Sequence, residues 1–322
     1  MSLDLSSLTV QFAHPAYRFA DRFARRNSGI RHFQTWSLEE TADRLGEARV
    51  LVTSGFWRND LLARAGDLAF IQVCAVGHDQ FDQAALRAAG VRLANAAGVN
   101  ARAVSDHALG LLLALGRHLP AARDNQRRQH WRGMISDLEA REDELAGKTV
   151  LIYGLGAIGG RIARLCQAFE MRVLGIRRNT AQPVAGVDEL HPPEAFRDLL
   201  PAVDVLILSC PLTPQTRNLV DAEALAALPN SALLINVARG GCIDEDALIA
   251  GLEAGALAGA ALDVTVEEPL PAASPLWGFD NVLITPHSGG ETRRYEDNVI
   301  DILLDNLDRL ARGETALRSQ IV

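Results

Sequence analysis

Three polar residues follow predicted strands in the C-terminal half of the chain, where they could act together on one small molecule. Arg239 follows the segment ALLINVA, Glu268 follows ALDVTVE and His287 follows VLITP. Histidine transfers protons readily near neutral pH, and a neighbouring carboxylate favours its charged form. Arginine presents a planar pair of donors that matches a carboxylate. This set suits the protonation of a 2-keto acid during hydride transfer.

Each of these residues also has an ordinary structural interpretation. Arg239 would serve as a surface ion-pair partner, Glu268 as a loop carboxylate and His287 as a turn residue after Pro286. The functional interpretation is favoured by their positions at successive strand ends, because the carboxyl ends of parallel strands meet at one edge of a sheet.

A glycine-rich turn after the predicted strand Thr149–Tyr153 is the strongest single motif. Gly154, Gly156 and Gly159 have G-x-G-x-x-G spacing, and apolar residues then recur at helical intervals as far as Phe169. The glycines permit a tight turn, close approach of a pyrophosphate and packing of the helix on the strand. The helix N-terminus then directs its N–H groups at the anion. A structural glycine turn is the alternative, but the strand–turn–helix context favours a bound dinucleotide.

The next predicted strand, Arg172–Ile176, is followed by Arg177 and Arg178. A site that prefers NAD has an acidic residue about 20 residues after the glycines, where it holds the ribose 2′-hydroxyl. Two arginines would instead bind a 2′-phosphate. We therefore expect NADP(H) to be preferred, with NAD(H) possible. The alternative is that arginine is simply common in this chain, whose only lysine is Lys148, and that NAD is accepted.

Residues 1–100 alternate short predicted strands with amphipathic helices, which indicates a second, smaller parallel sheet. The expected strands are Leu8–Phe12, Val50–Thr53, Phe70–Cys74 and Val91–Ala94. The expected helices are Leu38–Leu45, Asn59–Ala65 and Asp82–Ala89, the first with Ser37 and Glu40 as a capping box. The loop after the third strand offers the amides of Val76 and Gly77 to a small carboxylate, and a structural turn explains this loop equally well.

The remaining elements complete an α/β pattern. Asn100–Arg117 is an expected apolar helix between the two sheets, and the charged segment Arg123–Glu144 is either an exposed arm or an oligomer contact. The later expected strands are Arg172–Ile176, Asp204–Ser209, Ala232–Asn236, Gly259–Val264 and Val282–Ile284. The expected helices are Glu194–Leu200, Ala222–Ala227, Asp244–Glu253 and Glu291–Gly313, the last returning to the N-terminal half.

Composition argues against several classes of partner. A net charge of −8 and the lack of a basic tract argue against nucleic acid. The apolar runs are too short to cross a bilayer and the N-terminus has no signal-peptide pattern, so we expect a cytoplasmic protein with no membrane partner. The four cysteines have neither C-x-x-C nor metal-ligand spacing, so no metal site is expected.

The order of these motifs resembles the D-isomer-specific 2-hydroxyacid dehydrogenase family. The resembling segments are AVGHDQFD, LIYGLGAIGGRIA, CPLTPQT, NVARGGCIDEDAL, ALDVTVEEPLP and TPHSGGET. The resemblance implies a small 2-keto or 2-hydroxy acid as substrate, of the glyoxylate or hydroxypyruvate type. It implies that His287 is the acid/base paired with Glu268 and that Arg239 binds the substrate carboxylate and carbonyl. It also implies two Rossmann-like domains with parallel sheets, the nucleotide-binding domain inserted in the substrate domain, and usually a homodimer.

The resemblance assigns domain boundaries and further site residues. The dinucleotide-binding domain would span residues 101–287, and the substrate domain residues 1–100 and 288–322. Substrate would be held by the Val76–Gly77 backbone at its carboxylate, together with Arg239 and His287, and Asp263 would lie near the nicotinamide carboxamide. The implied cofactor-binding residues are Gly154, Leu155, Gly156, Ala157, Ile158, Gly159, Arg177, Arg178, Cys210, Pro211, Thr216, Val237, Ala238, Asp263 and Gly289.

Other proteins that share this fold provide the alternatives. Formate dehydrogenases have Gln where this chain has Glu268, and phosphite dehydrogenase uses a lysine in the substrate loop, where Val76 and its neighbours offer none. The regulatory type of phosphoglycerate dehydrogenase has an additional C-terminal domain, for which we expect no room before Val322. A dinucleotide-sensing corepressor retains the Arg, Glu and His, so these residues do not exclude it. Corepressors generally have long disordered tails, which we do not expect here.

Overall fold

A computed structural model describes residues 4–138 and 140–322 and divides them into two compact units. Unit 1 combines the residues up to Asn100 with Thr292–Val322, and unit 2 is Ala101–Glu291. The division after Glu291 lies beyond the boundary of 287 that the sequence suggested. The reason is local, because the amides of Ser288 and Gly289 donate to the Asp263 carboxylate and tie this turn to unit 2.

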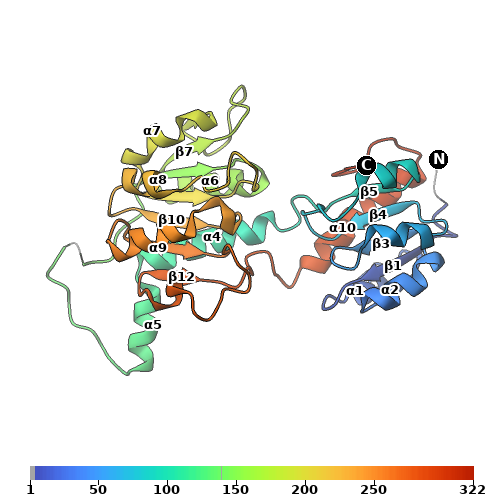
Figure 1. The fold of residues 1–322 in the computed structure, drawn as a ribbon, viewed down its shortest axis with the longest axis horizontal. Coiled ribbons are helices and arrows are strands. Elements are labelled where there is room, and N and C mark those ends of the chain that lie inside the picture. The colour runs from blue at the N-terminus through green and yellow to red at the C-terminus, as the bar shows by residue number, and fades with distance from the viewer. Residues whose placement is uncertain (1–3, 139) are drawn as a thin grey trace. The chain divides into compact units, whose positions relative to one another are not determined.

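Unit 1 contains a five-stranded parallel sheet in the order β2-β1-β3-β4-β5 (Figure 1). Its strands are β1 (Thr9–Ala13), β2 (Arg31–Thr35), β3 (Val50–Thr53), β4 (Phe70–Val73) and β5 (Arg92–Ala94). Its helices are α1 (Phe19–Ala24), α2 (Leu38–Arg44), α3 (Gln83–Ala88) and α10 (Tyr295–Ala311), with 3-10 turns η1 (Leu45–Glu47) and η2 (Asn59–Arg64). Val50 and Val52 of β3 pack with α1 and α10, whereas Leu51 packs with α2, η2 and α3 on the other face.

Unit 2 is built on a seven-stranded parallel sheet in the order β12-β11-β10-β9-β6-β7-β8. Its strands are β6 (Thr149–Tyr153), β7 (Arg172–Ile176), β8 (Glu189–His191), β9 (Val205–Leu208), β10 (Leu233–Asn236), β11 (Gly259–Leu262) and β12 (Val282–Ile284). The order reverses between β6 and β9, because β7 and β8 follow β6 on one side while β9 to β12 extend on the other. Ligands of open α/β sheets bind at such a reversal, outside the carboxyl ends of the strands.

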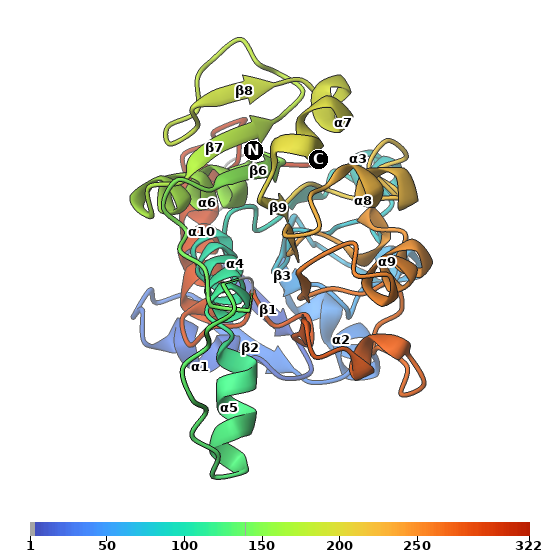
Figure 2. The ribbon, with the colours of Figure 1, turned by 90° about the vertical axis from the view of Figure 1, so that its left-hand side faces the viewer.

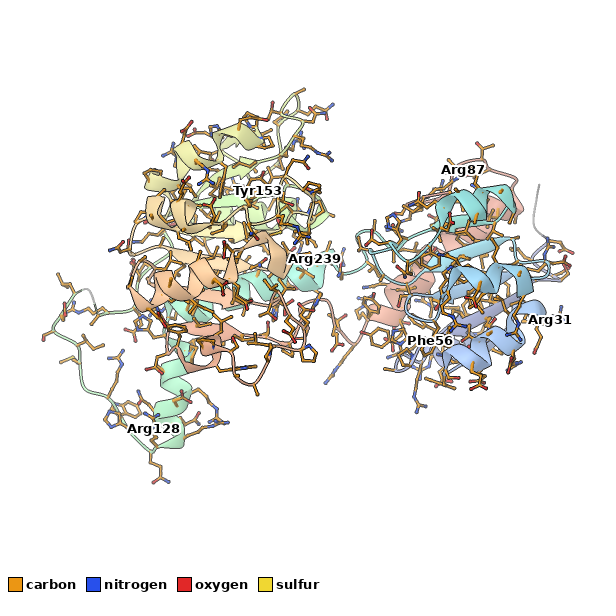
Figure 3. All side chains as sticks on the ribbon, in the orientation of Figure 1. Arg31, Phe56, Arg87, Arg128, Tyr153 and Arg239 are labelled. Carbon is orange, nitrogen blue, oxygen red and sulfur yellow. The ribbon has the colours of Figure 1, made fainter. Side chains whose placement is uncertain are left out.

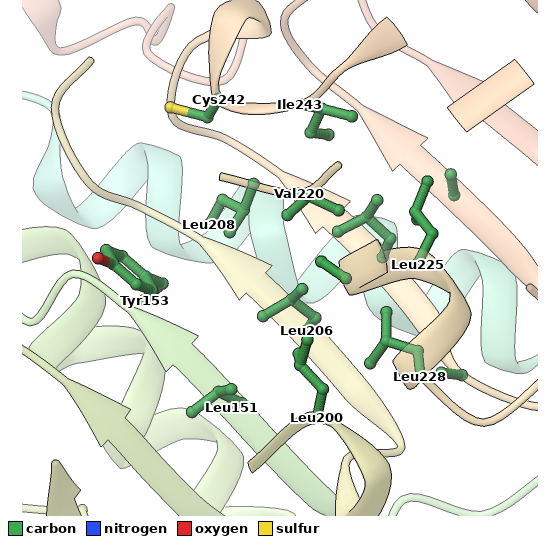
Figure 4. Packing of buried hydrophobic residues seen from close by; sticks show 14 of the residues in the cluster. Leu151, Tyr153, Leu200, Leu206, Leu208, Val220, Leu225, Leu228, Cys242 and Ile243 are labelled. Carbon is green, nitrogen blue, oxygen red and sulfur yellow. The ribbon is translucent and has the colours of Figure 1, made fainter. Parts of the chain in front are cut away.

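Helices cover both faces of this second sheet (Figure 2). They are α4 (Ala101–Gly116), α6 (Ala157–Ala168), α7 (Phe196–Leu199), α8 (Ala222–Ala227) and α9 (Glu245–Glu253), whereas α5 (Leu119–Arg127) has no buried residue. The 3-10 turns are η3 (Pro193–Ala195), η4 (Leu200–Ala202), η5 (Gly240–Cys242) and η6 (Pro275–Gly278). Val150 and Ile152 belong to the apolar cluster that includes α4 and α6. Leu151 and Tyr153 belong to the cluster on the other face, to which α7, α8 and α9 contribute and part of which Figure 4 shows. The expected α/β fold with two parallel sheets is confirmed.

Local differences from the expected elements have identifiable causes. Strands β2 and β8 lie at sheet edges and are only partly buried, so they lack the apolar runs that mark the central strands. Residues expected as a helix at 59–65 form the 3-10 turn η2 instead. The helix expected at Glu194–Leu200 is interrupted, with a 3-10 turn on either side of α7, and each of these turns contains a proline.

The capping box at the start of α2 forms as expected at the N-cap. Ser37 Oγ accepts a hydrogen bond from Glu40 N at 3.1 Å. The Glu40 carboxylate reaches one residue further back than the usual box and accepts from Trp36 N at 2.8 Å. Among the described residues, no helix combines the length and hydropathy that crossing a bilayer requires.

The segment expected as an exposed arm projects from the rest of unit 2 in Figures 1 and 2. This expected segment, Arg123–Glu144, includes the C-terminal part of α5, and its described residues at 128–138 and 140–144 belong to no helix or strand. We call α5 and these residues the arm. Trp131 is 97% exposed, and Met134 and Leu138 are also exposed. A groove of about 760 Å³ lies between α5 and residues 129–135 and is bordered by Trp131 and Met134.

Candidate dinucleotide and substrate site

The turn from β6 to α6 excludes side chains at two of its glycines. Gly154 has a φ of +101°, and a Cβ there would lie 2.8 Å from Cys210 Cα. A Cβ on Gly159 would overlap the carbonyl oxygen of Gly154 and lie 2.7 Å from Ser209 Oγ. Ser209 Oγ also donates to Gly154 O at 2.7 Å, a contact that the sequence did not suggest. Two of the three glycines therefore have the packing roles expected for a dinucleotide turn.

The N-terminus of α6 remains open for an anion. Gly156 is the N-cap, so no side chain caps the helix, and a Cβ at this residue would meet no described atom within 4 Å. Ala157, Ile158 and Gly159 form the first turn, whose N–H groups have no partner within the helix. Free amides, a positive dipole end and open space fit the pyrophosphate of a dinucleotide.

Leu155, in the middle of the turn, is buried and packs where a side chain on Gly175 would lie. Its Cδ1 is only 2.5 Å from the position that a Gly175 Cβ would take. The packing of Leu155 therefore requires glycine at position 175. The sequence feature that could have indicated this is a glycine inside an otherwise apolar strand.

Arg177 and Arg178 lie directly after β7, next to the glycine turn in the sheet. Arg177 is partly buried, and its Nη2 donates to Gln182 O at 2.7 Å, while its Nε is buried without a partner. Arg178 is exposed. Neither arginine forms an ion pair with another described residue. Both positive charges are therefore uncompensated by a nearby carboxylate.

Further cofactor-binding residues implied by the resemblance lie after strands β9 and β10. Cys210 is buried beside Gly154, and Val237 and Ala238 are buried after β10. Pro211 and Thr216 belong to one loop, in which Thr216 Oγ1 donates to Pro211 O at 2.7 Å and accepts from Thr213 N at 2.8 Å. The Thr216 hydroxyl therefore shapes its own loop.

Arg239 is the N-cap of η5, shortly after the end of β10, and is exposed (labelled in Figure 3). Its Nη1 donates to Ala238 O at 2.7 Å, and it pairs with no carboxylate in the described part of the chain. Buried Asn236 fixes this turn by donating to Arg239 O and accepting from Ala238 N. A Cβ on Gly240 would overlap the Thr265 backbone, so the Arg239 loop packs tightly on the Glu268 loop. The sequence feature that could have indicated this role of Asn236 is its position as a polar residue at the end of an apolar strand.

Glu268 and His287 meet as the sequence predicted. His287 Nδ1 lies 2.8 Å from Glu268 Oε2, and the two side chains are 48% and 39% exposed. The other carboxylate oxygen of Glu268 accepts from Thr265 N at 3.2 Å. With Nδ1 bound to the carboxylate, Nε2 of His287 is the ring atom available to a ligand. Arg239, Glu268 and His287 follow the adjacent parallel strands β10, β11 and β12, so they share one sheet edge.

The backbone of His287 is held in a left-handed conformation by hydrogen bonds to Asp263 and Thr285. Its φ is +53°, which is uncommon for a residue other than glycine. His287 N donates to Asp263 O at 2.8 Å and to Thr285 O at 2.9 Å. Ser288 N and Gly289 N donate to the Asp263 carboxylate at 3.0 to 3.2 Å. Asp263 therefore fixes the His287 loop with both its main chain and its side chain.

Asp263 is kept ionised although it is almost completely buried. Burial raises the pKa of this carboxyl, but hydrogen bonds from His107 and Thr285 outweigh that effect and hold the pKa below its ordinary value. Thr285 Oγ1 donates to Asp263 Oδ1 at 2.6 Å. His107 is a residue of this site that the sequence did not identify, because it lies on the apolar helix α4, far away along the chain.

In unit 1, the loop after β4 presents the amides expected to bind a carboxylate. Val76 and Gly77 are exposed, and their N–H groups donate to no acceptor among residues 4–138 and 140–322. Buried Asn95 donates to Val76 O at 2.7 Å and accepts from Ala97 N at 3.1 Å, which fixes the carbonyl side of this loop. Nearby Trp57 packs in the core against Phe81.

Comparison with known proteins identifies the family. A sequence profile described as D-isomer specific 2-hydroxyacid dehydrogenase, NAD binding domain, matches residues 109–289. The chain is 33% identical over 288 residues to a glycerate dehydrogenase from Methylorubrum extorquens, covering 87% of this chain and 88% of the relative. It is also 33% identical over 281 residues to a D-3-phosphoglycerate dehydrogenase from Methanocaldococcus jannaschii. That match covers 86% of this chain but only 52% of the relative, so the chain spans about half of its length.

A solved structure extends the similarity over almost the whole chain. The crystal structure of a D-isomer specific 2-hydroxyacid dehydrogenase family protein from Aeromonas salmonicida superposes with a TM-score of 0.86 at 31% identity. The superposition covers 98% of this chain and 99% of that protein. The chain therefore belongs to the D-isomer specific 2-hydroxyacid dehydrogenase family, a group of oxidoreductases that use a nicotinamide dinucleotide.

Proposed function

We propose that this protein reduces a small 2-keto acid of the hydroxypyruvate or glyoxylate type to the corresponding 2-hydroxy acid. The observation that carries the proposal is the 2.8 Å contact between His287 and Glu268, at the sheet edge that also bears Arg239. The similarity to a glycerate dehydrogenase supports it, because oxidation of glycerate at its 2-hydroxyl gives hydroxypyruvate.

Different residues of the chain would have different roles in this reaction. A bound nicotinamide dinucleotide supplies the hydride for the carbonyl carbon. His287 donates a proton from Nε2 to the carbonyl oxygen, and Glu268 stabilises the imidazolium and fixes the ring. Arg239 binds the carboxylate and polarises the carbonyl. The Val76 and Gly77 amides bind the substrate carboxylate.

The test is turnover by the purified protein with hydroxypyruvate, glyoxylate and pyruvate, each with NADPH and with NADH. We expect hydroxypyruvate or glyoxylate to cause loss of the reduced-nicotinamide absorbance at rates of at least about 1 per second. Tight cofactor binding without turnover of any of these acids would instead favour a dinucleotide-sensing protein of the corepressor type.

We propose further that NADP(H) is the preferred cofactor. Arg177 and Arg178 follow β7 without a carboxylate partner among the described residues, at the place where an acidic residue would serve NAD. The double variant Arg177→Asp, Arg178→Ala should lower kcat/KM for NADPH by roughly 100-fold, since hydrogen bonds to charged groups contribute about 1.5–3 kcal/mol each. The value for NADH should fall far less. Steady-state kinetics with each cofactor measures both.

The matched control for the cofactor experiment is Arg172→Ala. Arg172 is an exposed arginine on the same strand, but it pairs with Glu189 and lies away from the turn. Its removal should leave both kcat/KM values within about twofold, because exposed ion pairs contribute little. A wild-type protein that prefers NADH would contradict the proposal.

We also propose that the protein is a homodimer that associates through the arm. Trp131 and Met134 leave large apolar surfaces exposed beside a groove, and contiguous apolar surface of this kind usually marks an interface. The variant Trp131→Ser, Met134→Ser should shift the molar mass measured by light scattering from about twice that of the chain toward that of one chain. Trp277→Ser, at another exposed tryptophan of unit 2, should leave the wild-type mass unchanged. A monomeric wild-type protein would contradict this proposal.

A further inference from the structure

His107 is a polar side chain on α4, a helix that otherwise packs its apolar residues on the sheet of unit 2. Its Nε2 lies 2.9 Å from Thr285 Oγ1 and 3.2 Å from Asp263 Oδ1. The ring is 24% exposed, so it is largely enclosed by the elements it contacts. A Cβ on Gly289 would lie 3.0 Å from His107 Cδ2, so the ring also packs against the His287 loop.

Counting protons shows which ring nitrogen of this histidine carries a hydrogen. Ionised Asp263 has only acceptors, and the single hydroxyl proton of Thr285 is donated to Asp263 Oδ1. The Thr285 oxygen therefore accepts from His107, and Nε2 must carry a hydrogen. This one N–H group donates to both Thr285 and Asp263. His107 is therefore the first donor of a hydrogen-bond network that joins His107, Thr285 and Asp263.

The network ends on the backbone of the proposed proton donor. Asp263 accepts from His107 and Thr285, and from Ser288 N and Gly289 N. The Asp263 carbonyl accepts from His287 N and helps to hold its left-handed conformation. Without the His107 donor, buried Asp263 and Thr285 would lose a partner, and the turn they fix would lose its anchor on α4.

We propose that His107 is a positioning residue for the reaction, which acts through Asp263 to set the orientation of His287 and of the turn at Ser288 and Gly289. The kinetic part of this inference rests on the proposed function. A displacement of the proton donor by about 1 Å can lower the rate of the reaction about 100-fold. A residue that does not touch the substrate can therefore affect kcat by holding the donor in place.

The experiment compares His107→Leu with His107→Gln. Leucine removes the donor, and kcat for keto-acid reduction should fall by at least about tenfold with KM changed less than about threefold. The amide nitrogen of glutamine can take the place of Nε2 and donate to both partners, so His107→Gln should recover most of kcat. Asp106→Asn is the matched control, because Asp106 is the adjacent residue of α4 and pairs with Arg161 instead.

Nitrogen NMR of the histidine rings tests the geometry independently of turnover. In the wild-type protein His107 should carry a hydrogen on Nε2, and His107→Leu should shift the His287 ring signals while Asp106→Asn leaves them in place. A folded His107→Leu protein with the wild-type kcat would overturn the proposal. A His107→Gln protein whose kcat is no higher than that of His107→Leu would do the same. So would a His107 ring that has no hydrogen on Nε2, even if the protein reduced no keto acid.

Discussion

Replacing His287 with asparagine should lower kcat for keto-acid reduction by at least about 100-fold, because the carbonyl oxygen loses its proton donor. Asparagine is the informative replacement, since it tolerates the left-handed backbone that His287 adopts at a φ of +53°. The backbone contacts to Asp263 and Thr285 should then persist. Alanine would add backbone strain to the chemical loss and confuse the two effects.

A measurement of cofactor binding distinguishes the loss of the proton donor from a structural disruption of the site. The dissociation constant of NADPH, measured by fluorescence, should change less than about threefold in His287→Asn, because binding depends on the glycine turn and not on proton donation. Glu268→Gln should show a smaller loss, since it keeps a hydrogen-bond acceptor but removes the charge that stabilises the imidazolium. Full activity in His287→Asn would disprove the assignment of the proton donor.

Local patterns in the sequence were sufficient to predict the glycine turn between β6 and α6. Strand, glycine turn and helix are adjacent in the chain, so spacing alone predicted the roles that Gly154 and Gly159 have in the structure. The His287–Glu268 contact was predictable for a related reason. Both residues follow neighbouring strands of a parallel sheet, and the carboxyl ends of such strands meet at one edge.

The supporting residues could not be predicted, because their partners are distant in sequence. His107 contacts Thr285 across 178 positions, and on an apolar helix it resembles any polar residue near a helix start. Asn95 fixes the loop of Val76 through a side-chain hydrogen bond to the Val76 carbonyl. No spacing pattern in the sequence predicts such a contact. The edge strands β2 and β8 were missed for a different reason, since partial burial removes the apolar run that defines a central strand.

Replacing Arg239 with methionine should lower kcat/KM for the keto acid by at least about 100-fold, through both a higher KM and a lower kcat. Hydrogen bonds between charged groups contribute about 1.5–3 kcal/mol each, and a bidentate contact to a carboxylate has two. Arg239→Lys should recover only part of the loss, because an ammonium keeps the charge without the planar fork. Steady-state kinetics with varied keto acid measures the two parameters separately.

This result would report on substrate binding and not on folding, because the Arg239 side chain is exposed and pairs with no described carboxylate. The thermal midpoint of Arg239→Met should therefore stay within a few degrees of wild type. Arg197→Met is the matched control, since Arg197 is also exposed in unit 2 but pairs with Asp221. It should keep the wild-type KM. If Arg239→Met retained the wild-type KM for the keto acid as well, carboxylate recognition would belong to other donors, and the Val76 and Gly77 amides would be the first to examine.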